Sequence, residues 1–442
     1  MLFSPIERYV HILLKKMHKL SASRGATEGL GNMNFKTGRA LASVALVGSF
    51  VVAALPVVSS ASTSTVSDST FNTSFSTMKY LKSIVQKGKG SIAVILPDTK
   101  SSARYTEFDA PYLVKAFKAA GLTSKQYIVQ NAQGSDATQF NMAQADISKG
   151  AKVLLVDPLD GTTGALIEQY AKDHGVKTID YDRLTLGGAR SYYVSFDNVK
   201  VGQLIGQGEL ACLTAWKVKS PTVMYISYGD PTDNNATLFA QGYNSVLKTA
   251  GFNTTSTTAA GTKQTVLESA GTWVAATALR DFQGALTAHK NINAAVTPND
   301  ANAAGIITYM QAQGLKPNKF PFTGQDAQLT GIQNVISGYQ CGTVYKPIWL
   351  EAQAAAALAV YLRAGVKPPT GLLNGKSSDT LEGKSVPAVL LSPKWVTPSQ
   401  VESTVIKDRV LTVAQLCANT APVVANSKQP TYAADCKKYG IK

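Results

Sequence analysis

From Ile92 onward the chain repeats one pattern: a short apolar run, then a longer stretch with apolar residues every three or four positions. The short runs are typical of buried strands, and the longer spacing is that of one face of a helix. Buried strands followed by amphipathic helices indicate parallel sheets built from right-handed βαβ units. The expected strands are Ile92–Pro97, Gln126–Ala132, Val153–Asp157, Lys177–Asp182, Tyr192–Asp197, Thr222–Ser227, Ala294–Asn299, Pro321–Gln325 and Gly342–Lys346. The expected helices are Ala110–Ala120, Ala137–Lys149, Leu166–His174, Val199–Trp216, Leu238–Ala250, Trp273–His289 and Pro347–Ala364.

Polar residues follow several of the expected strands, at the sheet edge where ligands bind in parallel α/β folds. They are Asp157, Asp182–Arg183, Asp197–Asn198, Asn299–Asp300 and Gln325–Asp326. Each alone could simply cap the helix that follows. Together they describe a polar rim between two sheets that suits a ligand covered in hydroxyl groups, because Asp accepts, Arg donates and Asn does both. Trp273 and Tyr105 are candidates for the aromatic face of such a sugar site.

Length and charge narrow the class of protein. A chain of 442 residues exceeds the size at which one hydrophobic core stops growing, so two lobes are expected. The net charge of +15 invites a nucleic-acid partner, but seven of the 43 Lys and Arg residues lie in residues 1–39. The others form no basic blocks with interleaved aromatic residues, so no nucleic-acid partner is expected. With no CxxC spacing, and with His174 and His289 each alone, no metal site or cofactor is expected either.

The N-terminal region has the order of a secretory signal. Lys36 and Arg39 precede the uncharged apolar run Ala40–Leu55, and small residues follow up to a plausible cleavage site after Ala61. An uncleaved membrane anchor is the alternative, and Met33 is a second candidate start. Residues 62–90 begin with a Ser/Thr-rich stretch and are expected to form a linker. The protein is therefore expected outside the cytoplasm, in the periplasm or on the outer face of the cytoplasmic membrane.

Export makes disulfides possible for the four cysteines. Cys417 and Cys436 are the favoured pair because they would close a short loop in the C-terminal tail. Cys212 and Cys341 then remain, either as a second disulfide or as two buried thiols.

Catalytic motifs are missing from the sequence. It contains no P-loop, no HExxH and no GxSxG elbow. A glycosidase needs one protonated carboxyl group, whereas Arg183 beside Asp182 favours the ionised form. Binding without chemistry is the better interpretation, and a secreted sugar-processing enzyme is the alternative from another class.

Six short stretches resemble, in order and rough spacing, the xylose-type periplasmic sugar-binding proteins, which are solute receptors of ABC transporters. These stretches are Asp180–Arg183, Ser195–Gly202, Asp233–Phe239, Pro298–Ala301, Gly324–Ala327 and Thr343–Pro347. The resemblance covers about Ser91 to Pro393. It implies a type I periplasmic-binding-protein fold: two doubly wound parallel-sheet lobes, three hinge crossovers, and an aldopentose or aldohexose held between the lobes. It also implies an ABC transporter permease as partner and a monomeric receptor.

The resemblance assigns sugar contacts to nine residues: Arg104, Tyr105, Asp182, Arg183, Asn235, Trp273, Asn299, Asp326 and Lys346. Tyr105 and Trp273 would stack on the sugar, and the others would hydrogen-bond its hydroxyl groups. Tyr105 stands where the xylose receptors have Trp, which leaves open whether xylose, glucose, arabinose or another monosaccharide is bound.

The domain organisation expected from the sequence patterns and the resemblance together has five parts. They are a leader (1–61), a linker (62–90), an N-terminal lobe (91–197 with 346–376), a C-terminal lobe (198–345 with 386–416) and a tail (417–442). The crossovers would fall near Phe196–Val199, near Tyr345–Pro347 and within Lys376–Val386. A sugar sensor that presents its closed form to a membrane kinase would share every residue named. A LacI-type repressor shares the fold but needs a helix-turn-helix where this chain has an export leader.

Overall fold

The computed structural model describes residues 66–219, 221–255, 260–417 and 432–442. The expected leader, its signal sequence and the alternative membrane anchor lie outside these ranges. Within them, every helix is too short or too polar to cross a membrane.

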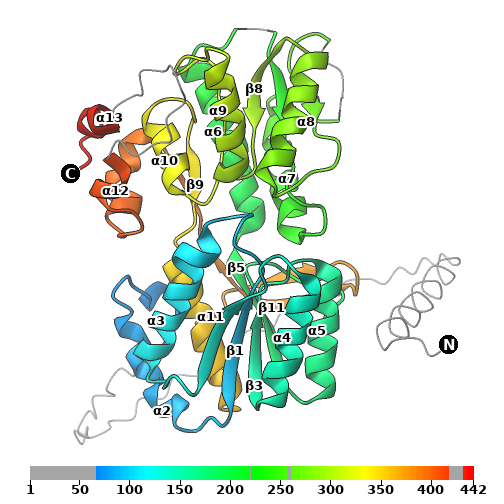
Figure 1. Cartoon of the computed structure of the whole chain (residues 1–442), viewed down its shortest axis with the longest axis vertical. Coiled ribbons are helices and arrows are strands. Elements are labelled where there is room, and N and C mark those ends of the chain that lie inside the picture. The colour runs from blue at the N-terminus through cyan, green and yellow to red at the C-terminus, as the bar shows by residue number, and fades with distance from the viewer. Residues whose placement is uncertain (1–65, 220, 256–259, 418–431) are drawn as a thin grey trace, which may run out of the picture. The chain divides into compact units, whose positions relative to one another are not determined.

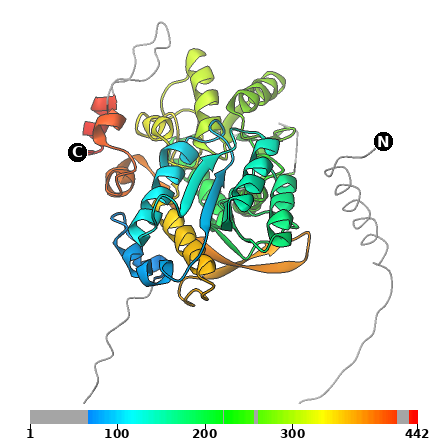
Figure 2. The ribbon, with the colours of Figure 1, turned by 60° about the horizontal axis from the view of Figure 1, so that its bottom comes forward.

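The first sheet has seven strands, five of them from the expected βαβ series. The neighbouring pairs are parallel except for β10 with β11. In sheet order the strands are β10 (Gly375–Asp379), β11 (Lys384–Leu391), β5 (Tyr192–Phe196), β4 (Lys177–Tyr181), β3 (Ala151–Val156), β1 (Ser91–Leu96) and β2 (Tyr127–Asn131). Helices α3 (Ala110–Ala120) and α11 (Ile348–Arg363) cover one face of this sheet, and α4 (Asp136–Ser148) and α5 (Gly161–Asp173) cover the other (Figures 1 and 2). This sheet and its helices form the N-terminal lobe.

The second sheet has three parallel strands: β7 (Gln264–Leu267), β6 (Val223–Ile226) and β8 (Ile292–Val296). The side chains of β6 alternate, so that Met224 and Ile226 join one core cluster while Val223 and Tyr225 join another. Four helices supply the two opposing layers: α6 (Asn198–Ala215), α7 (Asn234–Thr249), α8 (Ala275–Ala288) and α9 (Asp300–Ala312). This sheet and its helices form the C-terminal lobe. The predicted α/β class with parallel sheets is confirmed.

Two short strands lie where the chain passes between the lobes. β9 (Thr343–Tyr345) pairs with β12 (Lys394–Val396) in antiparallel register. The expected strand Pro321–Gln325 is reduced to single bridges, from Phe322 to Ala295 and from Gln325 to Val344. Helix α10 (Leu329–Ile336) follows this segment.

Two predicted boundaries differ from the structure. Residues 66–90 are not an open linker: Phe71, Phe75, Met78 and Leu81 are buried in the core of the N-terminal lobe. The segment contains the short helices η1 (Asp68–Thr70), η2 (Ser76–Leu81) and α2 (Lys82–Val85); Met78 and Leu81 lie in η2, and Phe71 and Phe75 lie in the turn before it. The Ser/Thr-rich composition hid apolar residues that recur every three or four positions.

The third crossover was also placed too early. The segment Lys376–Val386 spans most of the hairpin of β10 and β11, and β11 adds to the N-terminal sheet beside β5 as far as Leu391. Residues 386–391 therefore belong with the N-terminal lobe, and the passage to the other lobe follows Leu391. Val386, Ala388 and Leu391 are buried, which explains why this segment pairs with the sheet.

After β12 the chain continues into a C-terminal extension. Its elements are η4 (Pro398–Gln400), η5 (Glu402–Ile406), α12 (Val413–Cys417) and α13 (Tyr432–Lys438). It packs against α10. The predicted disulfide between Cys417 and Cys436 is present and joins α12 to α13.

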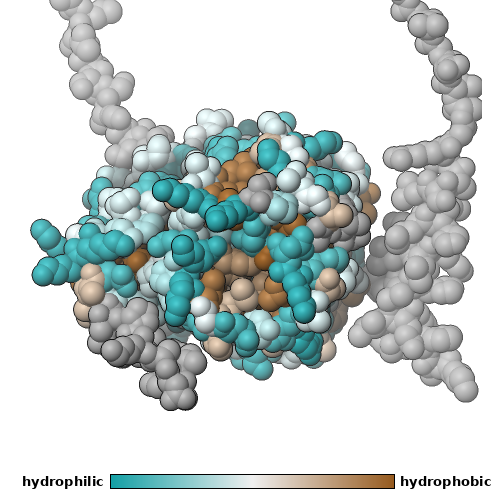
Figure 3. Space-filling model, turned by 90° about the horizontal axis from the view of Figure 1, so that it is seen from above, coloured by the Kyte–Doolittle hydropathy of each residue, from teal (hydrophilic) through white to brown (hydrophobic). Residues whose placement is uncertain are grey.

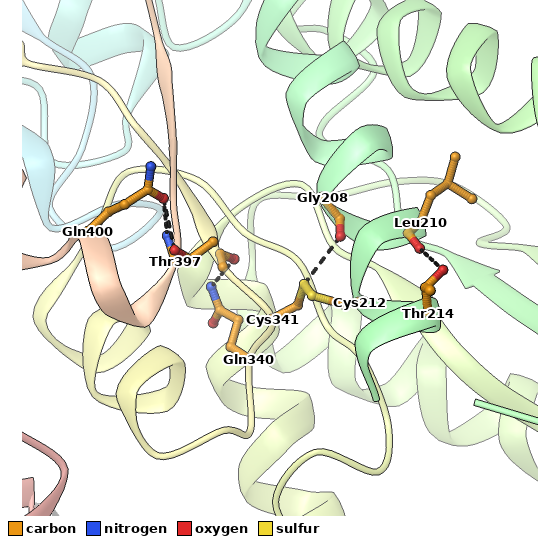
Figure 4. The surroundings of a disulfide bond; sticks show 9 residues. Gly208, Leu210, Cys212, Thr214, Gln340, Cys341, Thr397 and Gln400 are labelled. Carbon is orange, nitrogen blue, oxygen red and sulfur yellow. Dashed lines mark hydrogen bonds between the residues drawn. A yellow bond between two sulfur atoms is a disulfide. The ribbon is translucent and has the colours of Figure 1, made fainter. Parts of the chain in front are cut away.

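The second cysteine pair is also a disulfide. It joins Cys212 of α6 to Cys341, just before β9, at a sequence separation of 129. Figure 4 shows the bridge between the helix and this segment, with the Cys341 sulfur near the Gly208 carbonyl oxygen at 3.3 Å.

Large apolar side chains are scarce on the surface. In the described ranges the exposed ones are Tyr80, Ile128, Val274 and Leu381, each in a different part of the chain. Seen from above, the molecule presents a mostly hydrophilic or neutral face with apolar residues in separate spots (Figure 3). The polar and charged side chains that could bind a ligand are instead gathered in a cavity.

Candidate functional site

A cavity of about 310 Å³, partly open to solvent, lies at the carboxyl ends of the strands of both lobes. Its lining is Ser101, Ser102, Arg104, Tyr105, Asp182, Arg183, Asp233, Asn235, Phe239, Trp273, Asn299, Gln325, Asp326 and Lys346. All nine residues singled out from the sequence are among these. The loops after β1 and β4 supply the N-terminal side. The C-terminal side comes from the loops after β6, β7 and β8, from the first turns of α7 (Asn234–Thr249) and from the segment between α9 and α10, and Lys346 follows β9.

Arg183 connects the two sides of the cavity. Its guanidinium donates to the Tyr105 hydroxyl at 3.0 Å and to the Leu159 carbonyl at 3.0 Å. Its Nε lies 3.2 Å from a carboxylate oxygen of Asp233, which belongs to the other lobe. Asp157 lies behind Arg183, 3.7 Å from Nε and fully buried, with neither oxygen hydrogen-bonded. The predicted rim residue Asp157 is therefore a counterion to Arg183 and does not line the cavity.

Arg104 differs from the expected free donor. It is 1% exposed, and three carboxylates surround it. It donates twice to Asp109 at 2.8 Å, to Asp182 at 2.6 Å and to Glu351 of α11 at 2.7 Å. Most of its donor capacity is therefore used within the protein.

Asp182 is the acceptor at the centre of the N-terminal side. Burial acts to raise its pKa, but Arg104, Lys346 and Arg183 outweigh that effect and hold the pKa below its ordinary value. Its carboxylate is therefore ionised at neutral pH, as an acceptor of hydroxyl hydrogen bonds should be. Its φ of 59° lies in the left-handed region, which is uncommon for a non-glycine residue.

On the opposite side, Asp326 forms an ion pair with Lys346. The ammonium nitrogen lies 3.1 Å from the carboxylate, and both side chains are 4% exposed. The Ser102 hydroxyl, from the N-terminal lobe, donates to the other oxygen of Asp326 at 3.1 Å. Gln328 in turn donates to the Ser102 hydroxyl at 2.9 Å. The two lobes are thus in direct polar contact at this edge of the cavity.

Asp233 and Asn235 show how capping and ligand-facing roles combine. Asp233 caps α7 by accepting from the Asn235 amide at 2.8 Å, and its other oxygen accepts from the Trp273 indole at 3.1 Å. Asn235 donates to the Asp182 carbonyl oxygen at 3.0 Å. Asn299 likewise caps α9 while lining the cavity. A polar residue at a strand end can therefore cap the following helix and line the cavity at the same time.

Aromatic side chains form apolar surfaces within the polar lining. Phe239 and Trp273 meet edge to face with ring centroids 6.4 Å apart. Trp273 packs so close to Gly229 that a Cβ there would lie 2.2 Å from the indole ring. Tyr105 faces the guanidinium groups of Arg104 and Arg183 at 5.6 and 5.8 Å.

Five lining residues were not among the expected contacts. They are Ser101, Ser102, Asp233, Phe239 and Gln325. Asp233 and Phe239 flank the motif that drew attention to Asn235, and Gln325 closes an expected strand, so sequence position was a usable signal for all three. The two serines carry no such signal. Within the described ranges no cluster of three metal-ligating side chains occurs.

Glu268, at the end of β7, holds the start of one cavity loop through hydrogen bonds and has a pKa near neutral. Its carboxylate accepts from the Tyr228 amide at 2.6 Å and the Ser227 hydroxyl at 3.1 Å, at the start of the loop that leads to Asp233. Burial raises its pKa to about 7. The folded protein therefore retains a proton that the unfolded chain, with a Glu pKa of about 4.3, releases. The contribution of Glu268 to the free energy of unfolding is therefore greatest at low pH, and it is lost as pH rises through about 7.

We expect Glu268→Gln to flatten this dependence, because the amide oxygen can keep both hydrogen bonds and does not titrate. Urea unfolding at pH 5 and pH 8 would measure it: relative to the unsubstituted protein, the variant should be more stable at pH 8 than at pH 5. Glu382→Gln, at an exposed glutamate, is the control. Parallel pH profiles for Glu268→Gln and the unsubstituted protein would contradict the role of Glu268.

Comparison with known proteins identifies the family to which this fold belongs. Residues 92–367 match the family described as periplasmic binding protein domain. The D-xylose-binding periplasmic protein of Escherichia coli is 36% identical over 295 residues, which are 66% of this chain and 83% of that protein. A multiple sugar-binding periplasmic protein of Azospirillum brasilense is 32% identical over 336 residues, 74% of this chain and 91% of that protein.

A solved structure agrees with these relatives. The ABC transporter solute binding protein of Clostridium phytofermentans, with bound β-D-glucose, has a TM-score of 0.64 and 26% identity, covering 74% of this chain and 99% of that one. The resemblance inferred from the six short stretches is therefore confirmed. This chain belongs to the periplasmic binding protein family.

Proposed function

We propose that this protein is an extracytoplasmic receptor that holds one monosaccharide, an aldopentose or aldohexose, between its two lobes. The observation that carries the proposal is the cavity lining: carboxylate, guanidinium, ammonium and amide groups beside three aromatic side chains, contributed by both lobes. A sugar has hydroxyl groups around its edge and C–H groups on its faces, so this combination suits it. The names of the relatives given above describe sugar-binding or solute-binding proteins, and none of them describes an enzyme.

The partner and location follow from the same proposal. The receptor would deliver its sugar, as a monomer, to the permease of an ABC transporter. It would do so in the periplasm or on the outer face of the cytoplasmic membrane. Relatives named as periplasmic proteins and as an ABC transporter component support this assignment.

Binding would act by closing the lobes. Asp182 and Arg183 lie on one lobe, and Asn235, Asn299 and Asp326 on the other. A sugar that contacts both sets completes its hydrogen bonds only in the closed form, and that differential affinity shifts the population toward closure. Each charge-assisted bond contributes about 1.5–3 kcal/mol, so a missing or inverted hydroxyl would weaken binding measurably.

A thermal-shift panel of aldopentoses, aldohexoses and disaccharides tests the function. A ligand at 100 times its Kd stabilises the folded state by about 2.7 kcal/mol, which is visible as a rise in Tm. We expect one or two monosaccharides to raise Tm and the disaccharides to leave it unchanged, with calorimetry then giving the Kd. An unchanged Tm with every monosaccharide would contradict the proposal.

Gln328 tests the closure mechanism, because it does not line the cavity. Its side chain is buried and contacts Ser102 across the lobes. Gln328→Ala removes one hydrogen bond of the closed form, worth about 1 kcal/mol, so we expect affinity to fall about fivefold. Gln313→Ala, at an exposed position on α9, is the control, and an unchanged Kd in Gln328→Ala would argue against a contribution of this contact to closure.

A further inference from the structure

The C-terminal extension, Thr397–Lys442, has a core that packs behind one side of the cavity. It lies beyond residues 92–367, which match the family. Its buried apolar residues combine with those of α10, β9 and β12 in one group, here called the C-terminal cluster. The buried members are Ala327, Ile332, Ile336, Tyr345, Val396, Val401, Val405, Leu411, Leu416, Cys436 and Ile441.

Two members of the C-terminal cluster are direct neighbours of cavity residues in the chain. Ala327 follows Asp326, and Tyr345 precedes Lys346. Asp326 and Lys346 form the 3.1 Å ion pair of the cavity. The cluster is thus the packing behind both partners of that pair.

The backbone at Asp326 needs such support. Asp326 has a φ of 91° and Ala327 a φ of 52°, in the region that residues with a Cβ seldom occupy. Conformations of this kind persist where the surroundings determine them. Here the Asp326 amide donates to the Val344 carbonyl at 2.9 Å, and the Val344 amide donates to the Gly324 carbonyl at 2.9 Å. The turn is therefore hydrogen-bonded to β9. Strand β9 in turn pairs with β12, which leads into the extension.

A polar contact joins the extension to both sides of the hinge. Tyr345 is 1% exposed, and its hydroxyl donates to Asp408 of the extension at 2.9 Å. The same hydroxyl accepts from the indole nitrogen of Trp349 at 3.3 Å. Trp349 belongs to α11, which packs on the N-terminal sheet. Asp408, Tyr345 and Trp349 therefore link the extension, the strand that carries Lys346, and the other lobe.

We propose that the C-terminal extension positions the Asp326–Lys346 side of the sugar site, through the C-terminal cluster and the contact of Asp408 with Tyr345. This inference rests on the proposed sugar-binding function. The Cys417–Cys436 disulfide holds the two terminal helices of the extension together. Tyr345 and Asp408 are positioning residues, because neither lines the cavity.

Affinity measurements on the full chain test the proposal. Tyr345→Phe removes the hydroxyl and keeps the ring, and Asp408→Ala removes its acceptor. We expect each to raise the Kd for the best monosaccharide of the panel about tenfold, chiefly through faster dissociation. Asp408→Asn keeps an acceptor oxygen and should restore a Kd within about twofold of the unsubstituted protein. Tyr225→Phe is the matched control, because Tyr225 is buried and its hydroxyl has no hydrogen-bond partner.

A purely structural role would lower Tm while leaving the Kd of the folded fraction unchanged, and that result would overturn the proposal. Amide hydrogen exchange gives a second readout that needs no sugar. In Tyr345→Phe the amides of Asp326 and Val344 should exchange about tenfold faster, while those of β1 and β3 stay unchanged. If the unsubstituted protein binds no sugar, the proposed function fails, and exchange still decides the positioning role. Unchanged exchange at Asp326 and Val344 would refute it.

Discussion

Replacing Arg183 with alanine should abolish measurable sugar binding, with a loss of affinity of at least about 100-fold. Arg183 is the group through which Tyr105 of one lobe and Asp233 of the other meet at the cavity. Removing a buried, hydrogen-bonded charge typically costs about 2–5 kcal/mol of binding, because its partners are left unpaired as well. Calorimetry with the best monosaccharide of the panel measures the loss.

The fold should survive this substitution. Asp157 and Asp233 lose their counterion, but burial already raises the pKa of both carboxyl groups, so each can take up a proton. Arg183→Lys should bind only weakly, since an ammonium group cannot reproduce the planar fork that reaches Tyr105 and Leu159. Arg280→Ala, at an exposed position on α8, is the control. Affinity within a few-fold of normal in Arg183→Ala would remove Arg183 from the site.

Arg104→Met should have its main effect on folding. The guanidinium donates hydrogen bonds to Asp109, Asp182 and Glu351, and all of these side chains are almost fully buried. Breaking a buried charge cluster by removing one partner costs about 3–5 kcal/mol. We therefore expect the free energy of unfolding, measured in urea, to fall by about that amount.

A second substitution separates charge from packing at Arg104. Burial raises the pKa of Glu351 to about 8, even with Arg104 beside it. Adding Glu351→Gln to Arg104→Met removes one of the orphaned carboxyl groups and should recover part of the lost stability. An Arg104→Met protein as stable as the original, with sugar affinity alone reduced, would show that Arg104 is mainly a ligand contact, as the family resemblance implied.

Sequence reasoning located the cavity better than it described the contacts inside it. The polar residues at strand ends could be found because parallel strands bring their carboxyl ends to one edge of a sheet. The confinement of Arg104 could not, because Glu351 is 247 residues away in the chain and only the packing of α11 brings it close. Ser102 was missed for a similar reason, since its partners Asp326 and Gln328 belong to the other lobe.

Errors of boundary had other causes. Residues 66–90 were assigned by composition, which ignores the spacing of Phe71, Phe75 and Met78, and spacing determines burial. The resemblance predicts a crossover at the place where β10 and β11 form a hairpin. In the structure Val386 and Ala388 are buried while Pro387 between them is exposed, which is the alternation of a strand.

The Cys212–Cys341 bridge has a mechanical consequence. It closes a loop whose two ends, in α6 and just before β9, are 129 positions apart in the chain. This loop contains β6, β7 and β8. A pulling force applied at the two ends of the protein would pass through the sulfur atoms and bypass that loop. In force spectroscopy this bridge should shorten the extended chain by roughly 440 Å relative to a protein in which this bridge alone is absent. Under tension, the lobe that carries Asn235 and Asn299 would be shielded while the rest of the chain extends.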